Sequence, residues 1–433
     1  MDLEILVKKN PWWLGKEHIK EDVDYRKWEE KKIKWTPEIV DKININPFSL
    51  HFIFGPRQVG KTTSIKLLIK KLLEKKNPKS IFYFRCDEIG DYKELAEVLN
   101  EYLEFREREK IDSSIILLDE ITSPSEWWRT IKGFIDDGIF SKDTLILTGS
   151  ASIEVKKEAE YFPGRRGEGK NFRMYPLSFK EFVKLIKPKI AEKLHTDPCK
   201  NSVYLQELNK SLSDYFICGG FPLAINSYFE KGFVEESVKE TYLTWIKNDL
   251  TKTGRDDRIA REIIKVLTRK IPSPISFESI SKETSIKSPK TISSYLHTLS
   301  DLFVLEISYF IDPNTQIIQF GKNKKIHFID PLLFSIFEEW GLIKIKEKDS
   351  IIAESLLAVH LCRKHGNIFY WTNKEEIDSV IKKADGLIGY ECKWQEKAKE
   401  KRIKIGKLKE VWTISKKDLK GKIIPLSLFL YSL

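Results

Sequence analysis

Gly55-Pro56-Arg57-Gln58-Val59-Gly60-Lys61-Thr62 is the stretch that decides the fold of this 433-residue chain. It fits the pattern G-x-x-x-x-G-K-[ST] at every fixed position. Before it, residues 49–54 read as a short buried strand, and after it residues 63–73 have apolar residues at helical spacing. Glycines allow backbone N–H groups to surround a phosphate, and a helix N-terminus attracts that negative charge. The stretch therefore predicts a phosphate-binding loop (P-loop) in an α/β domain.

The loop also predicts which groups hold the nucleotide. We expect Lys61 to reach the β- and γ-phosphates and the Thr62 hydroxyl to bind magnesium, so the expected cofactors are ATP and Mg²⁺. The residues expected to line the nucleotide site are Gly55, Pro56, Arg57, Gln58, Val59, Gly60, Lys61, Thr62 and Thr63.

Two acids follow a second apolar run, residues 115–118. A buried parallel strand ending there would place Asp119 and Glu120 beside the phosphates, at the carboxyl edge of the sheet. We expect Asp119 to hold magnesium, and Glu120 to orient and deprotonate the attacking water. A second acid in this position favours hydrolysis over simple nucleotide switching.

Several further polar residues are candidates for the same site. Ser150 or Thr148, at the end of the strand predicted over 144–147, could sense the γ-phosphate or hold the water, or be ordinary loop hydroxyls. Arg165 is the first choice for an arginine finger and Arg166 the second, the alternative being two surface arginines. A finger that acts between subunits would imply a homo-oligomer, and one within the chain would not; both remain open.

Motifs along about nine-tenths of the chain carry a resemblance to a known group. The sequence resembles archaeal and bacterial AAA-type P-loop ATPases with a C-terminal domain of uncharacterised function. This resemblance implies an ASCE-type parallel-sheet core, a helical lid, a winged helix and a restriction-endonuclease-like C-terminal domain. The motifs are GPRQVGKTT (55–63), ILLDE (116–120), LTGSAS (147–152), Arg165-Arg166, YPLSFKEF (175–182) and GGFP (219–222).

Together these patterns predict five segments. We expect the tryptophans of the first segment to dock on the second. The segments are an N-terminal arm (1–45), the P-loop ATPase core (46–185), a helical lid or linker (186–264), a winged helix (265–312) and a nuclease-like domain (313–433).

Three acids and a lysine near the C-terminus resemble the PD-(D/E)xK nucleases. In that chemistry Asp378 and Glu391 bind one or two Mg²⁺ ions, and Glu354 completes the ligand set. Lys393 lies two residues beyond Glu391 on a predicted strand, so it shares its face and could orient water. Asp378 follows Ile377 instead of proline. An active metal site, a degenerate nuclease fold that still grips nucleic acid and a structural module remain alternatives.

Positive charge is concentrated in the C-terminal part. The net charge is +11, and residues 265–433 hold 29 Lys/Arg against 20 Asp/Glu, a net of +9. Such a field attracts DNA, duplex or branched, although lysine-rich faces can also be simply solvated. Trp394 and the basic run 397–409 are candidates for backbone contact, the alternative for the run being a solvated helix. Ser288 and Pro289 predict the start of a helix with Lys290, Thr291, Ser294 and His297 outward. This would be the recognition helix if the module reads DNA, and the alternative is a module for packing or protein contact.

Other features exclude several classes. No run of 18 apolar residues occurs, so we expect no membrane span or membrane partner. The five cysteines form no CxxC pair, and the first residues lack a signal-peptide core, so we expect a cytoplasmic protein. The leading hypothesis is an ATP-driven, DNA-acting protein that cuts DNA if the metal site is active. The alternatives are a signalling switch that binds a partner protein, and a metal-dependent nuclease in which ATP is structural.

Overall fold

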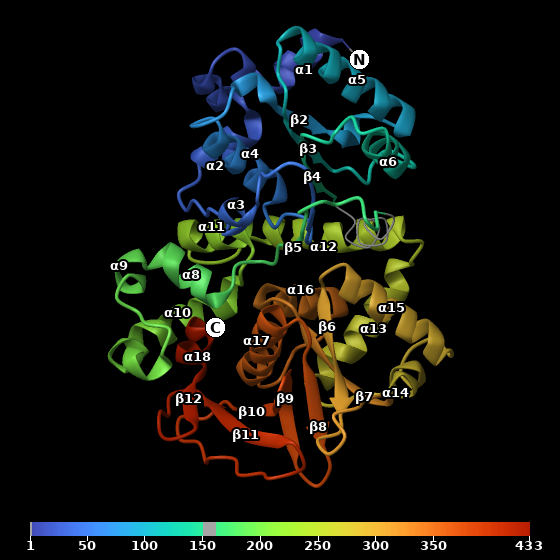
Figure 1. Ribbon diagram of the computed structural model, residues 1–433. Coiled ribbons are helices and arrows are strands. Elements are labelled where there is room, and N and C mark those ends of the chain that lie inside the picture. Colours follow the sequence, from blue (N-terminus) through green and yellow to red (C-terminus); the bar gives the residue numbers. More distant parts are fainter. Residues whose placement is uncertain (1, 150–161) are drawn as a thin grey trace. The chain divides into compact units, whose positions relative to one another are not determined.

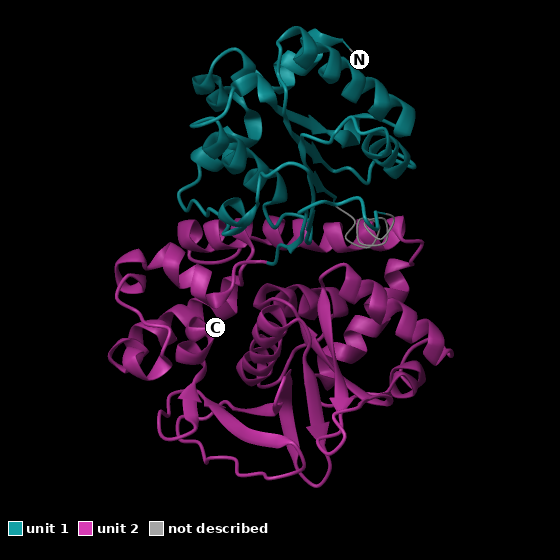
Figure 2. Ribbon diagram, in the orientation of Figure 1, with its two compact units in different colours: residues 1–175 teal, residues 176–433 magenta. Residues whose placement is uncertain are grey.

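Residues 2–149 and 162–433 are described by a computed structural model (Figure 1). Contacts divide the chain into two units, residues 1–175 and 176–433 (Figure 2). Among the helices in the described ranges, none combines the length and the apolar character needed to cross a bilayer.

A parallel sheet forms the core of the first unit. Within the described residues it has five strands in the order β2-β3-β4-β1-β5, and each pairs in parallel with its neighbours. This confirms the predicted parallel-sheet core, although the short β5 was not expected because it has no apolar run. The strands are β1 (Ser49–Phe54), β2 (Ile81–Arg85), β3 (Ile115–Asp119), β4 (Thr144–Thr148) and β5 (Asn171–Arg173).

The helices of this unit begin where the sequence offers a cap. Asp91, for example, accepts hydrogen bonds from the backbone N–H groups of Lys93 and Glu94 at the start of α5. The helices are α1 (Leu3–Lys9), α2 (Val23–Glu29), α3 (Ile39–Lys42), α4 (Lys61–Leu72), α5 (Tyr92–Arg108) and α6 (Trp128–Asp136).

The N-terminal segment docks its aromatic side chains on the sheet, as expected. Trp12 and Trp13 are buried, and both indole N–H groups donate to the carbonyl oxygen of Ile81 at 2.9 Å. The Trp13 ring also stacks on Phe105, with 4.6 Å between ring centroids. The segment contains the helices α1, α2 and α3.

The second unit holds a seven-stranded mixed sheet, counted over the described residues, in the order β12-β11-β10-β9-β8-β6-β7. Its strands are β6 (Leu305–Ile311), β7 (Ile318–Phe328), β8 (Phe369–Thr372), β9 (Glu376–Lys383), β10 (Gly386–Lys393), β11 (Leu408–Ser415) and β12 (Ile423–Pro425). Its helices are α8 (Phe179–Ile186), α9 (Pro188–Ala191), α10 (Leu205–Cys218), α11 (Pro222–Lys231), α12 (Glu236–Lys252), α13 (Asp257–Lys270), α14 (Phe277–Lys282), α15 (Pro289–Asp301), α16 (Pro331–Gly341), α17 (Lys348–His365) and α18 (Leu426–Ser432).

Two of the expected domain limits do not coincide with breaks in the packing. The first unit ends at Tyr175, ten residues before the expected limit, because Phe182 of α8 packs on Tyr215 of α10 with ring centroids 5.1 Å apart. The limit expected after residue 312 falls inside the β6–β7 hairpin. Since β6 also pairs in parallel with β8, this hairpin and the C-terminal strands form one sheet.

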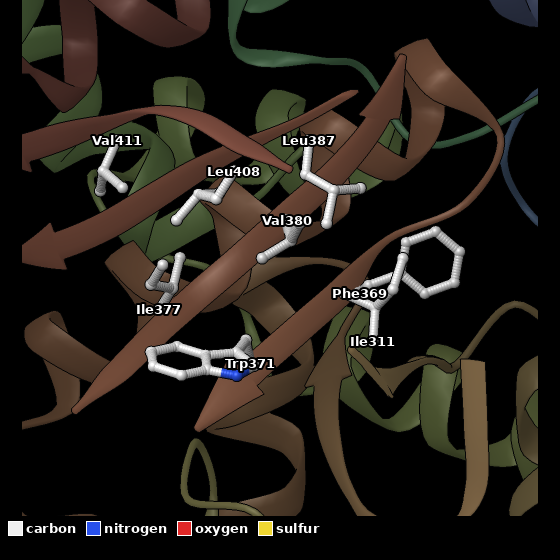
Figure 3. Packing of buried hydrophobic residues seen from close by; sticks show 8 residues of the cluster. All are labelled: Ile311, Phe369, Trp371, Ile377, Val380, Leu387, Leu408 and Val411. Carbon is white, nitrogen blue, oxygen red and sulfur yellow. The ribbon is translucent and has the colours of Figure 1, made fainter. Parts of the chain in front are cut away.

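Side chains on both faces of this sheet are buried, but they differ in polarity. An apolar cluster covers one face (Figure 3). Ile403 and Ile405 pack against it, and residues 397–407 are irregular while residues 408–409 begin β11, so the basic run 397–409 is not the solvated helix considered above. Alternation along β9 turns Asp378 to the face opposite Ile377, toward α17. The cluster is Ile311, Phe369, Trp371, Ile377, Val380, Leu387, Leu408 and Val411.

Candidate functional site

The P-loop requires its two glycines for different reasons. Gly60 has φ +99°, a left-handed conformation that a side chain disfavours. A Cβ atom on Gly55 would lie 2.3 Å from the carbonyl oxygen of Met174, so the close approach of the chain after β5 excludes any side chain there. Gln58 also has positive φ, at 59°. The loop therefore has the tight curvature that the motif predicts.

Lys61 is the first residue of α4 and points back along the loop. Its Nζ donates to the carbonyl oxygens of Gly55 and Pro56, each at 2.8 Å, and only 6% of the residue is exposed. The ammonium group and the N-terminus of α4 thus concentrate positive charge in one place. This geometry is compatible with the phosphate-binding role predicted for residues 55–62.

Asp119 is fully buried at the end of β3 and accepts several hydrogen bonds. Thr62 Oγ1 donates to its Oδ2 at 2.6 Å, and the Tyr83 hydroxyl donates to the same atom at 3.3 Å. Thr148 Oγ1 donates to the other carboxylate oxygen. The structure therefore brings together Thr62 and Asp119, the two residues predicted to hold magnesium, and a hydroxyl and a carboxylate oxygen suit that hard cation.

The backbone of Glu120 departs from the extended conformation of β3. Its φ of 53° is left-handed, and its N–H donates to Thr148 Oγ1 at 3.4 Å. Left-handed conformations of residues other than glycine cost free energy and cluster at functional sites. This backbone turns the partly buried Glu120 out of the strand direction next to Asp119.

The remaining candidates of the ATP site have different outcomes. Thr148 contacts Asp119, whereas Ser150 lies outside the described residues. Arg165 Nε donates to Asp136 of α6 at 2.5 Å, and Arg166 lies over the Phe52 ring at 5.0 Å. A finger role for either arginine stays a prediction.

A buried lysine that the sequence did not single out connects the N-terminal segment to this site. Lys66 of α4 is 1% exposed, and its Nζ lies 2.9 Å from Asp22 Oδ2 and 3.0 Å from the centre of the Tyr83 ring. Burial lowers the pKa of Lys66, and Asp22 opposes that shift. Because the Tyr83 hydroxyl reaches Asp119, one chain of contacts runs from residue 22 to the predicted magnesium ligand. Nothing in the local sequence pairs these distant positions.

In the second unit, Glu354 and Asp378 meet at a lysine that sequence reasoning also missed. Lys325 of β7 is buried, and its Nζ lies 2.7 Å from Glu354 Oε1 and 2.8 Å from Asp378 Oδ1. A third carboxylate, that of Glu376, is 2.6 Å away. In the sequence, Lys325 stands out just as a charged residue next to the apolar C-terminal end of β7.

The electrostatics of this cluster follow from burial. Burial raises the pKa of Glu354 to about 8, with a further rise from Asp378 and an opposing effect of Lys325. Burial would lower the pKa of Lys325, but the surrounding carboxylates raise it above its ordinary value. The cluster therefore favours a charged Lys325, and burial makes Glu354 harder to ionise than an exposed glutamate.

Glu391 and Lys393 are paired at the end of β10. Lys393 Nζ lies 2.6 Å from Glu391 Oε1, and burial, then Asp378, raise the pKa of Glu391. Within residues 2–149 and 162–433, no three His, Cys, Asp or Glu side chains are arranged to hold a metal ion. Magnesium at Glu354, Asp378 and Glu391, with Lys393 beside it, stays a prediction.

The predicted recognition helix, α15, exposes fewer polar groups than expected. Ser288 caps it by accepting from the Thr291 N–H, as predicted. Lys290 and His297 are exposed, but the Ser294 hydroxyl accepts a hydrogen bond from Arg255 at 2.5 Å.

Comparisons with known proteins match separate parts of the chain. A family model described as an AAA domain matches residues 48–183, and one described as a domain of unknown function (DUF8612) matches residues 209–341. The uncharacterized protein MJ1637 of Methanocaldococcus jannaschii is 24% identical over 374 residues, which cover 79% of this chain and 75% of that protein.

Solved structures give distant likenesses. The Walker-type ATPase PABY2304 of Pyrococcus abyssi is 14% identical with a TM-score of 0.42, covering 73% of this chain and 94% of its own. The ORC2 protein of Aeropyrum pernix is 9% identical with a TM-score of 0.38, covering 74% and 92%. No conclusion about this chain follows from likenesses this distant. The AAA match covers residues 48–183, which also contain the P-loop motif and the parallel sheet, so this part of the chain is similar to AAA domains.

Proposed function

We propose that this chain hydrolyses ATP with Mg²⁺ and uses the cycle to act on DNA. The observation that carries the first part is the 2.6 Å contact between Thr62 Oγ1 and Asp119 Oδ2, beside the ammonium group of Lys61. A magnesium–triphosphate ligand needs a lysine, a hydroxyl group and a carboxylate close together. Lys61 and Thr62 supply the first two at the start of α4, and the buried Asp119 supplies the carboxylate.

Each residue then has a defined role. Lys61 and the backbone N–H groups of residues 55–62 hold the phosphates, and Thr62 and Asp119 hold the metal, which neutralises phosphate charge when bound. Glu120 orients the attacking water and accepts its proton. Thr148 and Tyr83 fix the Asp119 carboxylate by donating to it.

The action on DNA rests on charge and on the helices before β6. Residues 265–433 carry most of the excess positive charge, and Lys290 and His297 stand exposed on α15. We propose that α13, α14 and α15 with the β6–β7 hairpin act as a winged helix, that residues 186–264 act as a lid, and that DNA, duplex or branched, binds this half. Arg165 acting on a neighbouring copy would make the protein a homo-oligomer.

The test is steady-state ATP hydrolysis with and without duplex, branched and single-stranded DNA at two salt concentrations. Stimulation by DNA that falls steeply with salt is expected, because the logarithm of affinity falls by about 0.9 per phosphate neutralised for each unit of log salt. A rate of ATP hydrolysis that changes with none of the DNA forms would overturn the DNA role and favour a switch that binds a protein partner.

DNA cleavage is a second candidate, favoured by one observation. Glu391 Oε2 is buried without a hydrogen-bond partner in the described residues, as a metal-binding oxygen can be when its ion is absent. Against it, Lys325 already lies between Glu354 and Asp378. We therefore favour a nuclease-like fold that grips DNA without cutting it. Mg²⁺-dependent cleavage by the wild type that Asp378→Ala and Lys393→Ala abolish would reverse this preference.

A further inference from the structure

A pocket of about 500 Å³ opens in the second unit. It is lined by α10, α16 and α17 and by the residues that directly follow β10 and β11. Its size lies within the range of about 300–1,000 Å³ typical of small-ligand sites.

The pocket lies where parallel strands end. β10 and β11 run parallel, with Lys393 opposite Ser415, so the next residues, Trp394 and Lys416, emerge side by side from the sheet. In open α/β sheets, ligands bind at the carboxyl ends of such strands. Lys393, which pairs with Glu391, immediately precedes the pocket wall.

The charged residues of the lining are mainly lysines. Lys210, Lys348, Lys416 and Lys417 line the pocket with one acid, Asp349. Lys348 pairs with Glu338 at 2.6 Å and Lys417 with Glu396 at 2.7 Å, but in the described part of the chain Lys210 and Lys416 have no carboxylate within ion-pair distance. Two ammonium groups are therefore available to an anion.

Part of the remaining wall is apolar and aromatic. Trp394 lies 5.3 Å from Phe216 between ring centroids, and the ammonium of Lys416 stands 5.6 Å from the Trp394 ring. Ile217, at the edge of the pocket, is 50% exposed. A planar group that slides onto Trp394 would release Lys416 to pair with a phosphate attached to that group.

We propose that this pocket binds a nucleotide unit of single-stranded nucleic acid, with its base against Trp394 and its phosphate held by Lys416 and Lys210. Stacking on an aromatic side chain beside a basic groove is how proteins hold single strands without reading sequence. A base inside a duplex is already stacked and cannot enter. The inference deepens the proposed action on DNA and rests on it.

The test measures binding of a fluorescent ten-residue oligo-dT to the full chain by anisotropy, without ATP. Trp394→Ala should weaken binding about tenfold or more, since one base stacked on an aromatic ring is worth a factor of that order. Trp394→Phe should retain most of the affinity, and Lys416→Ala should weaken binding and reduce its salt dependence.

A matched pair elsewhere on the same sheet provides the control. Lys422 lies over Trp412 at 5.9 Å, outside the pocket lining, so Trp412→Ala and Lys422→Ala should leave oligo-dT binding unchanged. Thermal unfolding of each variant confirms that it is folded.

Three outcomes would overturn the inference. Trp394→Ala could leave the affinity for oligo-dT unchanged, or Trp412→Ala could lower that affinity as much as Trp394→Ala does. The wild type could also bind oligo-dT, duplex DNA and dTMP with equal affinity. The two proposals fail separately. If DNA stimulates ATP hydrolysis but Trp394→Ala changes no binding, only the pocket is refuted. If Trp394→Ala weakens oligo-dT binding but no DNA stimulates hydrolysis, only the ATP coupling is refuted.

Discussion

The two units each bury a lysine in a polar site, and they hold it differently. Lys61 donates to two backbone carbonyls of its own loop, while Asp119 takes its hydrogen bonds from hydroxyl groups. Lys325 is held by three carboxylates, among them Glu354 and Asp378. The carboxylate of the first unit is thus held by neutral hydroxyl groups, and the carboxylates of the second unit share one buried ammonium group.

The two arrangements differ in how much free energy it costs to replace the partner of the carboxylate. A neutral hydroxyl beside Asp119 can exchange its partner for a cation at little cost, because no charge is left unpaired. Displacing Lys325 would leave a buried ammonium without its partners, which is strongly unfavourable. Similar residue types near sheet strands are thus held by neutral groups in one unit and by a charged partner in the other.

Glu120→Gln should give the largest effect, because it removes the proposed general base of the first unit. We expect turnover to fall by about 10²–10⁴-fold while ATP still binds. Phosphate release and calorimetric ATP binding measure the two separately. Lys61→Ala is the control and should lose hydrolysis together with most of the binding. Rapid turnover by Glu120→Gln would refute the assigned role.

Lys325→Met should destabilise the second unit by about 3–5 kcal/mol, because it leaves buried carboxylates without their cation. Hydrogen exchange of the β7 and β9 amides measures the local opening free energy. Lys322→Met, at an exposed position of the same strand, should have no such effect. Adding Asp378→Asn to Lys325→Met should recover part of the loss. If Lys325→Met is as stable as the wild type, the contrast between the units is wrong.

His360 offers a pH test of the second unit. Its Nε2 accepts from the Phe179 N–H at 3.0 Å, Nδ1 lies 2.9 Å from the Leu356 carbonyl oxygen, and burial, then Arg363, lower its pKa to about 3. A lowered pKa means that the stabilisation is complete above the unfolded value of about 6.5 and is lost as pH falls toward 3.

His360→Gln should therefore be less stable than the wild type at pH 7.5. The difference in free energy of unfolding between the two proteins should shrink by about 1.4 kcal/mol per pH unit below about pH 6, because only the unfolded wild type gains a proton at that position. Urea unfolding from pH 7.5 to 5 measures this difference, in which other titrating groups cancel. A gap that stays constant with pH would show that the histidine is not held neutral.

Tyr83→Phe should have the smallest effect, and it sharpens the picture of the first unit. Losing one hydrogen bond to Asp119 should raise the Mg²⁺ concentration for half-maximal hydrolysis about two- to tenfold, with little change at saturation. Asp22→Asn, which weakens the hold on Lys66, should act in the same direction. Tyr92→Phe is the control. If the Mg²⁺ dependence is unchanged in both variants, the contacts that run from Asp22 through Tyr83 do not influence the predicted magnesium site.

The sequence predicted the first unit better than the second. The strands β1 to β4 are buried on both faces and therefore appear as continuous apolar runs that end at recognisable motifs. α16 could not be recognised from its sequence, PLLFSIFEEWG, because it is apolar nearly all round and shows no helical period. The pairing of β6 with β8 joins positions about sixty residues apart, and no local pattern encodes it.

By itself, the sequence determined the P-loop, the two acids at the end of the β3 segment and the alternation of strands and helices around them, because these depend on local spacing and backbone geometry. Only the tertiary structure decided that Lys66 reaches Tyr83 and Asp22, and that Lys325 lies among Glu354, Glu376 and Asp378. The physical reason is that a buried charge selects its partner by distance in space, and the chain brings those partners together only after both units have packed their cores.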